Sequence, residues 1–402
     1  MFPISNPLSR LRIAGMGLAF KVYQFPKPVS FVGPDSSLAL CREIAATGVK
    51  RLTLITDGPL FKLGVVGPII KTLKAAGLTV DVFDKIEPDP GYEMIEAGIA
   101  RLRKSRAQAV LAVGGGSSID GAKTMVACYA NDCHPSKLIG LFKVRKMGIP
   151  FYAVPTTAGT GSEVTVAAVV TDKAAQQKHA IIDPKLVPQM VALDPLLMLG
   201  LPPHITAATG MDALTHAVEA YISTLATAET DQLAQSATAS IVHSLPLAYK
   251  TGSNVEVRER MALASFNAGL AFTRAGVGYV HAIAHQLGGL YHVPHGLANA
   301  IVLPYVLDFS LPNCTERLAE LALCAGIGTT KLDDEQLADR FIAHIRKMNK
   351  EMGIPTTIKQ LRREDFGTII DRALAEAHGT YGVPRYMAHS DCWDLLDQLL
   401  PD

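Results

Sequence analysis

Four of the chain's 12 histidines fall in one otherwise apolar stretch, GYVHAIAHQLGGLYHVPHGLANAIVL, which runs from Gly278 to Leu303. His281 and His285 are four residues apart, so in a helix their side chains project from the same face, one turn apart. His295 follows a proline and precedes a glycine, a break at which its side chain can be directed back toward that face. A single histidine in an apolar helix is usually a hydrogen-bonded core residue, but four in one segment indicate a functional site.

A second apolar segment, GMDALTHAVEAYI (210–222), carries Asp212 and His216 at the same four-residue spacing. A buried carboxylate beside an imidazole costs free energy unless another charge compensates it. A divalent cation would do so, and one aspartate with three histidines forms a donor set suited to Fe²⁺ or Zn²⁺, with room left for a substrate oxygen. Spacing alone does not decide whether His281 or His285 would be a ligand.

The length and composition exclude several classes of protein. A chain of 402 residues is long enough for two domains, and 49% hydrophobic with 19% charged residues is typical of a globular protein. The net charge of +1 gives no reason to expect nucleic acid or an acidic membrane surface as a partner. No apolar run reaches the length of a membrane span. The six cysteines are scattered without a CxxC pair, which favours reduced thiols in the cytoplasm.

The pattern of elements changes along the chain. Residues 1–28 are interpreted as an N-terminal tail packed on the first domain rather than a signal peptide, because Lys21 ends its short apolar patch. From Val29 to about Leu199 short apolar runs alternate with helical ones, which predicts a parallel α/β domain. After Pro202 the strand signal disappears and helical periods continue to the C-terminus. Within the first part we expect strands at 51–56, 78–84 and 107–117 and helices at 67–77 and 93–105.

The predicted strand at 107–117 runs into a glycine-rich turn, GGGSSIDGAK (114–123), which opens a helix. Backbone amides at such a helix start can bind a pyrophosphate, and this is where open α/β sheets bind their ligands. The G-x-G-x-x-G fingerprint is not present, because Ile119 stands at its third glycine. The hydroxyl-rich segment PTTAGTGSEVT (155–165) follows another strand-like run and could contact phosphate or ribose, or be an ordinary polar loop.

These motifs, with HAIAHQLGGLYHVPHGLANAIVLP (281–304), resemble those of the iron-containing (group III) alcohol dehydrogenases, and in the same order. The resemblance covers the chain from about Val29 to the C-terminus. It implies a Rossmann-like parallel α/β nucleotide-binding domain at 29–200. An all-helical metal-binding domain would follow at 201–402, in a dehydroquinate synthase-like architecture. It further implies NAD and Fe²⁺ as cofactors, with Zn²⁺ possible, a small-molecule alcohol or aldehyde substrate, and a cytoplasmic homodimer.

The resemblance also implies roles for particular residues. His285 maps onto the histidine near the nicotinamide that is not a ligand and is the expected catalytic residue, and Asp57 lies beside the adenosine ribose, where an acidic group repels a 2′-phosphate. Ala167 and Asp89 depart from the asparagines found in some members and leave the finer cofactor contacts open. The implied metal ligands are Asp212, His216, His281 and His295, and the other implied cofactor contacts are Gly115, Gly116, Ser117, Asp120, Thr156, Thr157, Thr160 and Lys178.

The predicted reaction is the interconversion of an alcohol and an aldehyde or ketone by hydride transfer in the interdomain cleft, with a bound metal lowering the pKa of the alcohol. A hydroxyacid–oxoacid transhydrogenase or a maleylacetate reductase-like oxidoreductase is the nearest alternative. A dehydroquinate synthase-like lyase would need a Lys and Arg cluster, but the segments 204–225 and 278–303 contain neither residue. A catalytically silent NAD-binding scaffold would need a broken ligand set, but all four implied ligand positions are intact in this sequence. The sequence identifies neither the physiological substrate nor the metal.

Overall fold

The computed structural model describes Gly15, Tyr23 and residues 25–401, which form two compact units. One unit comprises Pro26–Leu201 together with Ser253–Phe266. The other contains Pro202–Gly252 and the chain from Asn267 onward. The predicted tail at 1–28 lies almost entirely outside the described residues. Among the described residues, no helix combines the length and apolar character that crossing a bilayer requires.

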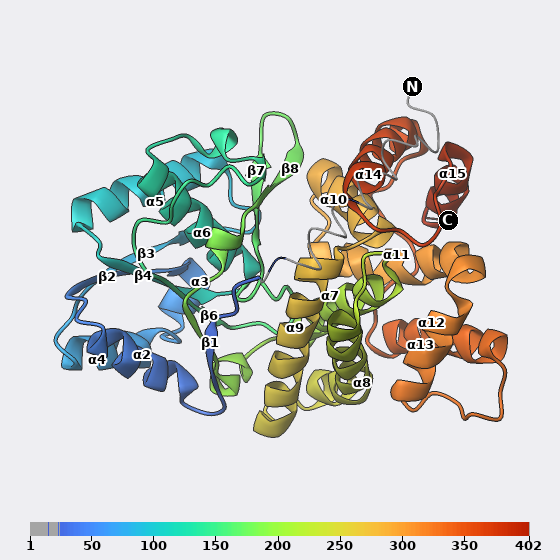
Figure 1. Ribbon diagram of the computed structural model, residues 1–402, viewed down its shortest axis with the longest axis horizontal. Coiled ribbons are helices and arrows are strands. Elements are labelled where there is room, and N and C mark those ends of the chain that lie inside the picture. Colours follow the sequence, from blue (N-terminus) through green and yellow to red (C-terminus); the bar gives the residue numbers. More distant parts are fainter. Residues whose placement is uncertain (1–14, 16–22, 24, 402) are drawn as a thin grey trace. The chain divides into compact units, whose positions relative to one another are not determined.

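A six-stranded parallel sheet forms the centre of the α/β unit, with the strand order β1-β9-β6-β4-β2-β3 (Figure 1). Every residue of β4 is buried, because helices cover the sheet on both faces. Along β4, Val110 and Ala112 pack into one hydrophobic cluster with α5 and α6, whereas Leu111 and Val113 pack into another with α2 and α4. The strands are β1 (Val29–Val32), β2 (Arg51–Asp57), β3 (Thr79–Ile86), β4 (Ala109–Gly114), β6 (Phe151–Pro155) and β9 (Met190–Leu193).

The helices and the remaining strands of this unit lie between those strands in the sequence. A second, three-stranded sheet has the order β5-β8-β7, and in it β7 and β8 pair antiparallel. The sequence patterns did not predict this sheet. The helices are α2 (Ser36–Ala46), α3 (Gly58–Lys62), α4 (Gly67–Ala75), α5 (Tyr92–Ser105) and α6 (Gly116–Asn131), and the second sheet contains β5 (Gly140–Leu141), β7 (Ala167–Asp172) and β8 (Gln177–Ile182). Short 3₁₀ turns lie at Pro135–Lys137, Pro184–Leu186 and Pro195–Met198.

The other unit is helical throughout its described residues. Its central helices α7 and α11 are buried along most of their length, since both are apolar nearly all round. The helices are α7 (Pro203–Ile222), α8 (Ala228–Lys250), α9 (Val255–Ala275), α10 (Tyr279–Tyr291), α11 (His295–Ser310), α12 (Thr315–Cys324), α13 (Asp334–Glu351), α14 (Phe366–Thr380) and α15 (His389–Gln398), with 3₁₀ turns at Leu311–Asn313 and Arg363–Asp365.

The predicted fold class is confirmed: a parallel α/β part precedes an all-helical part. The predicted strands correspond to β2, β3 and β4, and the predicted helices to α4 and α5, with ends that differ by at most three residues. The domain boundary near residue 200 stays a prediction. The α/β unit also includes Ser253–Phe266 of α9, a segment that helical periodicity alone assigned to the C-terminal part.

Candidate metal centre and nucleotide site

Four of the sequence-predicted residues converge in the helical unit. Asp212 and His216 lie one turn apart on α7 and are both buried. His281, in the first turn of α10, is buried too, and its ring stacks on that of His216 with centroids 4.4 Å apart. One donor atom each from Asp212, His216 and His281 can be chosen so that all three lie within 4.8 Å of one another.

His295 completes the cluster from the start of α11. His292 ends α10 in the left-handed conformation (φ 56°), and Pro294 precedes the first turn of α11, so the chain reverses over a few residues. The Nε2 atom of His295 lies 3.6 Å from Oδ1 of Asp212, and Nε2 of His281 lies 3.8 Å from the same oxygen. The predicted break before His295 therefore brings its ring to the face that His281 and Asp212 share.

The donor set fits a divalent cation. Donors around a tetrahedral metal with bonds of about 2.0–2.1 Å lie about 3.3–3.4 Å apart, close to the separations found here. Burial and the neighbouring His216, His295 and His285 hold the pKa of His281 well below its ordinary value, so its ring is neutral and has a lone pair to offer. Among the described residues, the ion pairs of Asp212 involve histidines only, and no Lys or Arg compensates its charge.

Glu219 is a member of this centre that the sequence reasoning missed. Its Oε2 lies 2.6 Å from Nδ1 of His281, and its Oε1 accepts a hydrogen bond from the backbone N–H of Val280 at 2.8 Å. Burial raises the pKa of Glu219 to about 8. A cation bound at Nε2 of His281 would favour the carboxylate form of Glu219. That carboxylate would then accept a hydrogen bond from Nδ1–H of His281 and orient the ring. Position 219 follows Asp212 by seven residues, two helical turns, and that spacing was a usable signal.

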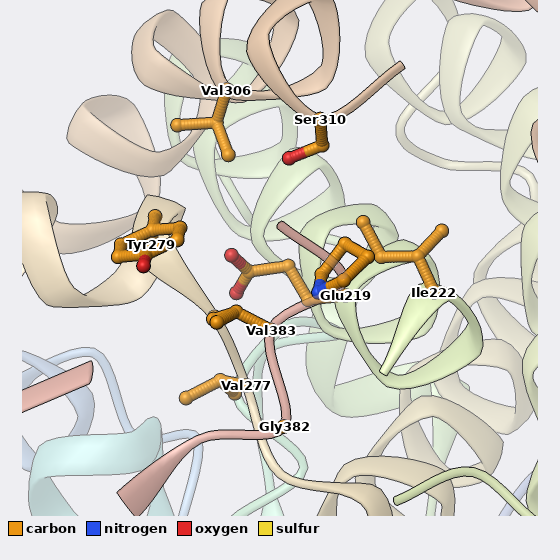
Figure 2. A pocket seen from close by; sticks show the side chains of 10 residues that line it. Glu219, Ile222, Val277, Tyr279, Val306, Ser310, Gly382 and Val383 are labelled. Carbon is orange, nitrogen blue, oxygen red and sulfur yellow. The ribbon is translucent and has the colours of Figure 1, made fainter. Parts of the chain in front are cut away.

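The surroundings of Glu219 explain its raised pKa. A small pocket beside it, lined mainly by Ile222, Val277, Val306 and Val383, has room for about one water molecule (Figure 2). Figure 2 shows the Glu219 side chain among these apolar groups and Tyr279. The carboxylate of Glu219 therefore has little solvent around it. Its charged form is stabilised by its hydrogen-bond partners, Nδ1 of His281 and the backbone N–H of Val280.

Asn299 is a second member that the sequence reasoning missed, one helical turn after His295. Its Nδ2 donates to Oδ1 of Asp212 at 2.6 Å and lies 3.2 Å from Nε2 of both His281 and His295. The Oδ1 atom of Asn299 is buried without a hydrogen-bond partner among the described residues.

His285 lies beside the cluster. Its ring stacks on that of His295, with centroids 5.3 Å apart and an interplanar angle of 14°, and its centroid is 6.0 Å from that of His281. Its Nδ1 lies 2.7 Å from Oε1 of Glu376 on α14. His285 is thus close to the proposed ligands while one of its two nitrogens is engaged by a carboxylate.

In the α/β unit, the glycine-rich turn lies at the carboxyl end of β4 and opens α6. No side chain caps the first turn of α6. The amides of Ser118 and Ile119 donate to the carbonyl of Gly115, so an anion at the positive end of the helix would meet the amides of Gly116 and Ser117. Gly115, Gly116 and Ser117 are partly exposed, whereas the residues on either side are buried. This is the arrangement that a pyrophosphate site requires.

The threonine-rich loop lies against this turn. A Cβ added at Gly116 would meet Cγ2 of Thr160 at 2.6 Å, and one at Gly115 would lie 3.5 Å from Oγ1 of Thr157. A larger residue at Gly116 would therefore collide with the side chain of Thr160. Thr156 is buried, and its backbone N–H donates to the carbonyl of Gly114 at 3.1 Å. The side chains of Thr157 and Thr160 therefore lie next to the glycines and are partly exposed, whereas Thr156 is buried.

Asp57 ends β2 and faces the same turn. Its Oδ1 accepts the backbone N–H of Leu60 at 2.8 Å as the N-cap of α3, and its Oδ2 lies 3.6 Å from the position that a Cβ on Gly114 would occupy. Burial raises its pKa above the ordinary value, and the hydrogen bond from Leu60 opposes this rise. One carboxylate oxygen therefore serves the helix cap while the other lies next to the glycines.

Two predicted cofactor residues are engaged elsewhere. Asp120 is buried one turn further along α6, where its Oδ2 accepts the backbone N–H of Val169 at 3.0 Å and ties the helix to β7. Lys178, on β8, forms an ion pair with Asp89, with Nζ and Oδ1 2.6 Å apart. Asp89 is one of the two departures from the family pattern, and here it takes the lysine expected to reach the ribose.

Comparison with known proteins agrees with this architecture. Residues 28–195 match the family described as "Iron-containing alcohol dehydrogenase", and residues 206–400 match "Fe-containing alcohol dehydrogenase family, C-terminal". The NAD-dependent methanol dehydrogenase of Bacillus methanolicus is 36% identical over 378 residues, which cover 94% of this chain and 99% of the relative. The 1,3-propanediol dehydrogenase of Klebsiella pneumoniae is 38% identical over 366 residues, which cover 90% and 95%.

A solved structure shares the whole fold. The alcohol dehydrogenase from Oenococcus oeni superposes with a TM-score of 0.91 at 35% identity and covers 94% of this chain and 100% of its own. The fold is therefore that of a dehydrogenase with a parallel α/β part and a helical part. The chain belongs to the iron-containing alcohol dehydrogenase family, whose members are oxidoreductases acting on CH–OH groups. The predicted family and enzyme class are confirmed.

Proposed function

We propose that this protein is an NAD-dependent, divalent-metal-dependent alcohol dehydrogenase that interconverts an alcohol and an aldehyde or ketone by hydride transfer. The observation that carries the proposal is the convergence of four donors. Nε2 of His295 and of His281 lie 3.6 and 3.8 Å from Oδ1 of Asp212, and donor atoms of Asp212, His216 and His281 lie within 4.8 Å of one another. Fe²⁺ suits this set and the family, and Zn²⁺ is compatible with the same donors. Bound there, the cation would lower the pKa of a substrate hydroxyl and polarise a carbonyl.

The α/β unit would bind the dinucleotide, which supplies the hydride chemistry. Gly115, Gly116 and Ser117 would hold the pyrophosphate through backbone amides at the start of α6. Thr157 and Thr160 lie against this turn and would contribute hydroxyl contacts. Asp57 would accept a hydrogen bond from the adenosine ribose and repel a 2′-phosphate, which favours NAD over NADP.

Asp120, Thr156 and Lys178 would act less directly. Asp120 and Thr156 are buried and hold α6 and the threonine loop in place. Lys178 would reach the ribose only by loosening its ion pair with Asp89. These three residues are therefore proposed as supports of the cofactor site, with Lys178 as a conditional contact.

His285 is proposed to accept the hydroxyl proton of the alcohol and to return one in the reverse direction. Its ring is stacked against that of His295, one of the proposed ligands, and imidazole is the side chain that most often transfers protons in enzymes. General acid–base catalysis contributes roughly 10²–10⁴-fold, and with a metal sharing the work the low end is expected. Substitution of His285 by Ala should keep metal and NAD binding and lower kcat roughly 10- to 100-fold.

The substrate class is to be found by assay. A panel of alcohols, diols and 2-hydroxyacids, run with iron- or zinc-reconstituted protein and NAD, separates an alcohol dehydrogenase from a hydroxyacid–oxoacid transhydrogenase or a maleylacetate reductase-like enzyme. We expect NADH formation with small neutral alcohols. Turnover confined to hydroxyacids or unsaturated keto acids would favour the alternative oxidoreductases, and no NADH formation with any substrate of the panel would contradict the proposal.

A homodimer in the cytoplasm is proposed as the working form. All six cysteines are unpaired, which suits a reducing compartment. Light scattering of the purified protein should give a mass of twice 42.9 kDa. A monomeric mass would contradict the dimer.

A further inference from the structure

A carboxylate outside the family motifs is hydrogen-bonded to the proposed catalytic histidine. Oε1 of Glu376 lies 2.7 Å from Nδ1 of His285, and both side chains are partly buried, with 28% and 19% of their surfaces exposed. The two residues are 91 positions apart and come from α14 and α10. Because Nδ1 is engaged, Nε2 is the nitrogen of His285 left for a substrate.

Two further donors hold Glu376. The hydroxyl of Tyr381 donates to Oε1 at 2.6 Å, and Nε2 of Gln286 donates to Oε2 at 3.2 Å. Burial alone would raise the pKa of Glu376, but His285 and the hydrogen bonds from His285 and Tyr381 bring it below its ordinary value. Burial and Glu376 raise the pKa of Tyr381 well above its ordinary value, so Tyr381 keeps its proton as a donor. An ionised carboxylate only accepts, so Nδ1 of His285 must carry a hydrogen.

We propose that Glu376 is a positioning residue that holds His285 in the Nδ1–H tautomer, with Tyr381 and Gln286 fixing the carboxylate. The proposal rests on the proposed role of His285. During alcohol oxidation the hydroxyl O–H bond breaks and an N–H bond forms at Nε2, while the hydride passes to NAD⁺. Glu376 remains ionised and stabilises the resulting imidazolium, which then releases its proton to solvent. A third group that orients a base in this way is a recurrent device in enzymes.

The tautomer of His285 can be measured without turnover. Metal-free protein labelled with ¹⁵N-histidine should show His285 as the Nδ1–H form in long-range ¹H–¹⁵N spectra, assigned by the loss of its signals in His285→Gln. In Glu376→Gln the amide can donate to Nδ1, so the signals should shift toward the Nε2–H form. A purely structural anchor between two helices would leave the tautomer of a folded Glu376→Gln variant unchanged.

Kinetics supply the second arm, with iron- or zinc-loaded protein. Glu376→Gln should lower kcat by roughly 10-fold or more, with metal content, NAD affinity and Tm equal to those of the control Asp371→Asn. Asp371 lies on the same helix and is exposed, so its variant removes a carboxylate charge away from the pair. In the double variant with His285→Ala, the change at Glu376 should cause no further loss of kcat, because both residues act through one imidazole.

The outcomes separate the two hypotheses. Wild-type kcat in His285→Ala would remove His285 from the proposed function. A loss in His285→Ala combined with unchanged kcat and tautomer in Glu376→Gln would overturn the role of Glu376 alone. If Glu376→Gln does not fold, Glu376→Asp keeps the charge but withdraws the oxygens by one methylene. A mixed tautomer population and an intermediate kcat are then expected, and wild-type values for both would overturn the proposal.

Discussion

Oε2 of Glu219 lies 2.6 Å from Nδ1 of His281, so the histidine that offers Nε2 to the proposed metal is held from behind by a buried carboxylate. Such outer partners fix the ring orientation and raise the basicity of a ligand, and their loss typically costs about 10- to 100-fold in metal affinity. The pair links α7 to α10 across 62 residues of sequence.

Glu219→Gln should therefore weaken Zn²⁺ binding by roughly 10- to 100-fold. The affinity is measured by competition with a chromophoric chelator. Glu335→Gln, at an exposed position in the first turn of α13, is the matched control and should bind Zn²⁺ as tightly as the wild type. Equal affinity in the Glu219 and Glu335 variants would show that the carboxylate does not support the metal centre.

Substituting any of Asp212, His216, His281 or His295 by Ala should abolish stoichiometric iron or zinc, because three donors hold the cation far less tightly than four. Circular dichroism should show that the helical content is largely retained. His285→Ala should keep its metal. If elemental analysis finds metal in His281→Ala but none in His285→Ala, the choice of ligand within this pair is wrong.

Asp57 caps α3 and is also proposed to contact the adenosine ribose, and substitutions can separate these two roles. Asp57→Asn keeps an acceptor for the N–H of Leu60 and removes the charge, so it should narrow or invert the preference for NAD over NADP in kcat/KM. Asp57→Gly should change the preference similarly but also lose the side-chain cap contact, which for a glycine costs only roughly a few tenths of a kcal/mol of stability. A wild-type enzyme with the higher kcat/KM for NADP would contradict the role of Asp57.

Glu163 predicts a pH dependence of stability in the α/β unit. It is buried beside Lys123, whose Nζ donates to the carbonyls of Thr165 and Ala167, and burial raises its pKa from 4.5 to about 7. The folded state therefore binds more protons than the unfolded state between these pH values. The stability contributed by this group is complete below pH 4.5 and is lost as the pH rises to 7.

Glu163→Gln cannot titrate, so it should be more stable relative to the wild type at pH 7.5 than at pH 5, by about 1–3 kcal/mol. Urea unfolding at the two pH values measures this difference. Glu87→Gln, at an exposed position of the same unit, should show none. An equal pH dependence in the Glu163 variant and the wild type would mean that burial does not raise the pKa of Glu163 in the folded protein.

The sequence alone determined the features that depend on short spacing. Short apolar runs alternating with helical periods identified the α/β part, and helical periods alone identified the helical part, because side-chain direction repeats within a few residues. The same local geometry placed Asp212 with His216 and His281 with His285. The glycines of the 114–116 turn were recognisable for a similar reason, because a strand followed at once by a glycine-rich turn and a helix is a local motif.

Only the tertiary structure decided which side chains act on these residues from elsewhere in the chain. Asn299 reaches Asp212 across 87 residues, Glu376 reaches His285 across 91, and Asp89 takes Lys178 across 89. No local periodicity encodes such pairs, because each depends on how two separately formed elements pack. The sequence could propose the donors of a metal centre, but the packing of α7, α10, α11 and α14 decided what orients them.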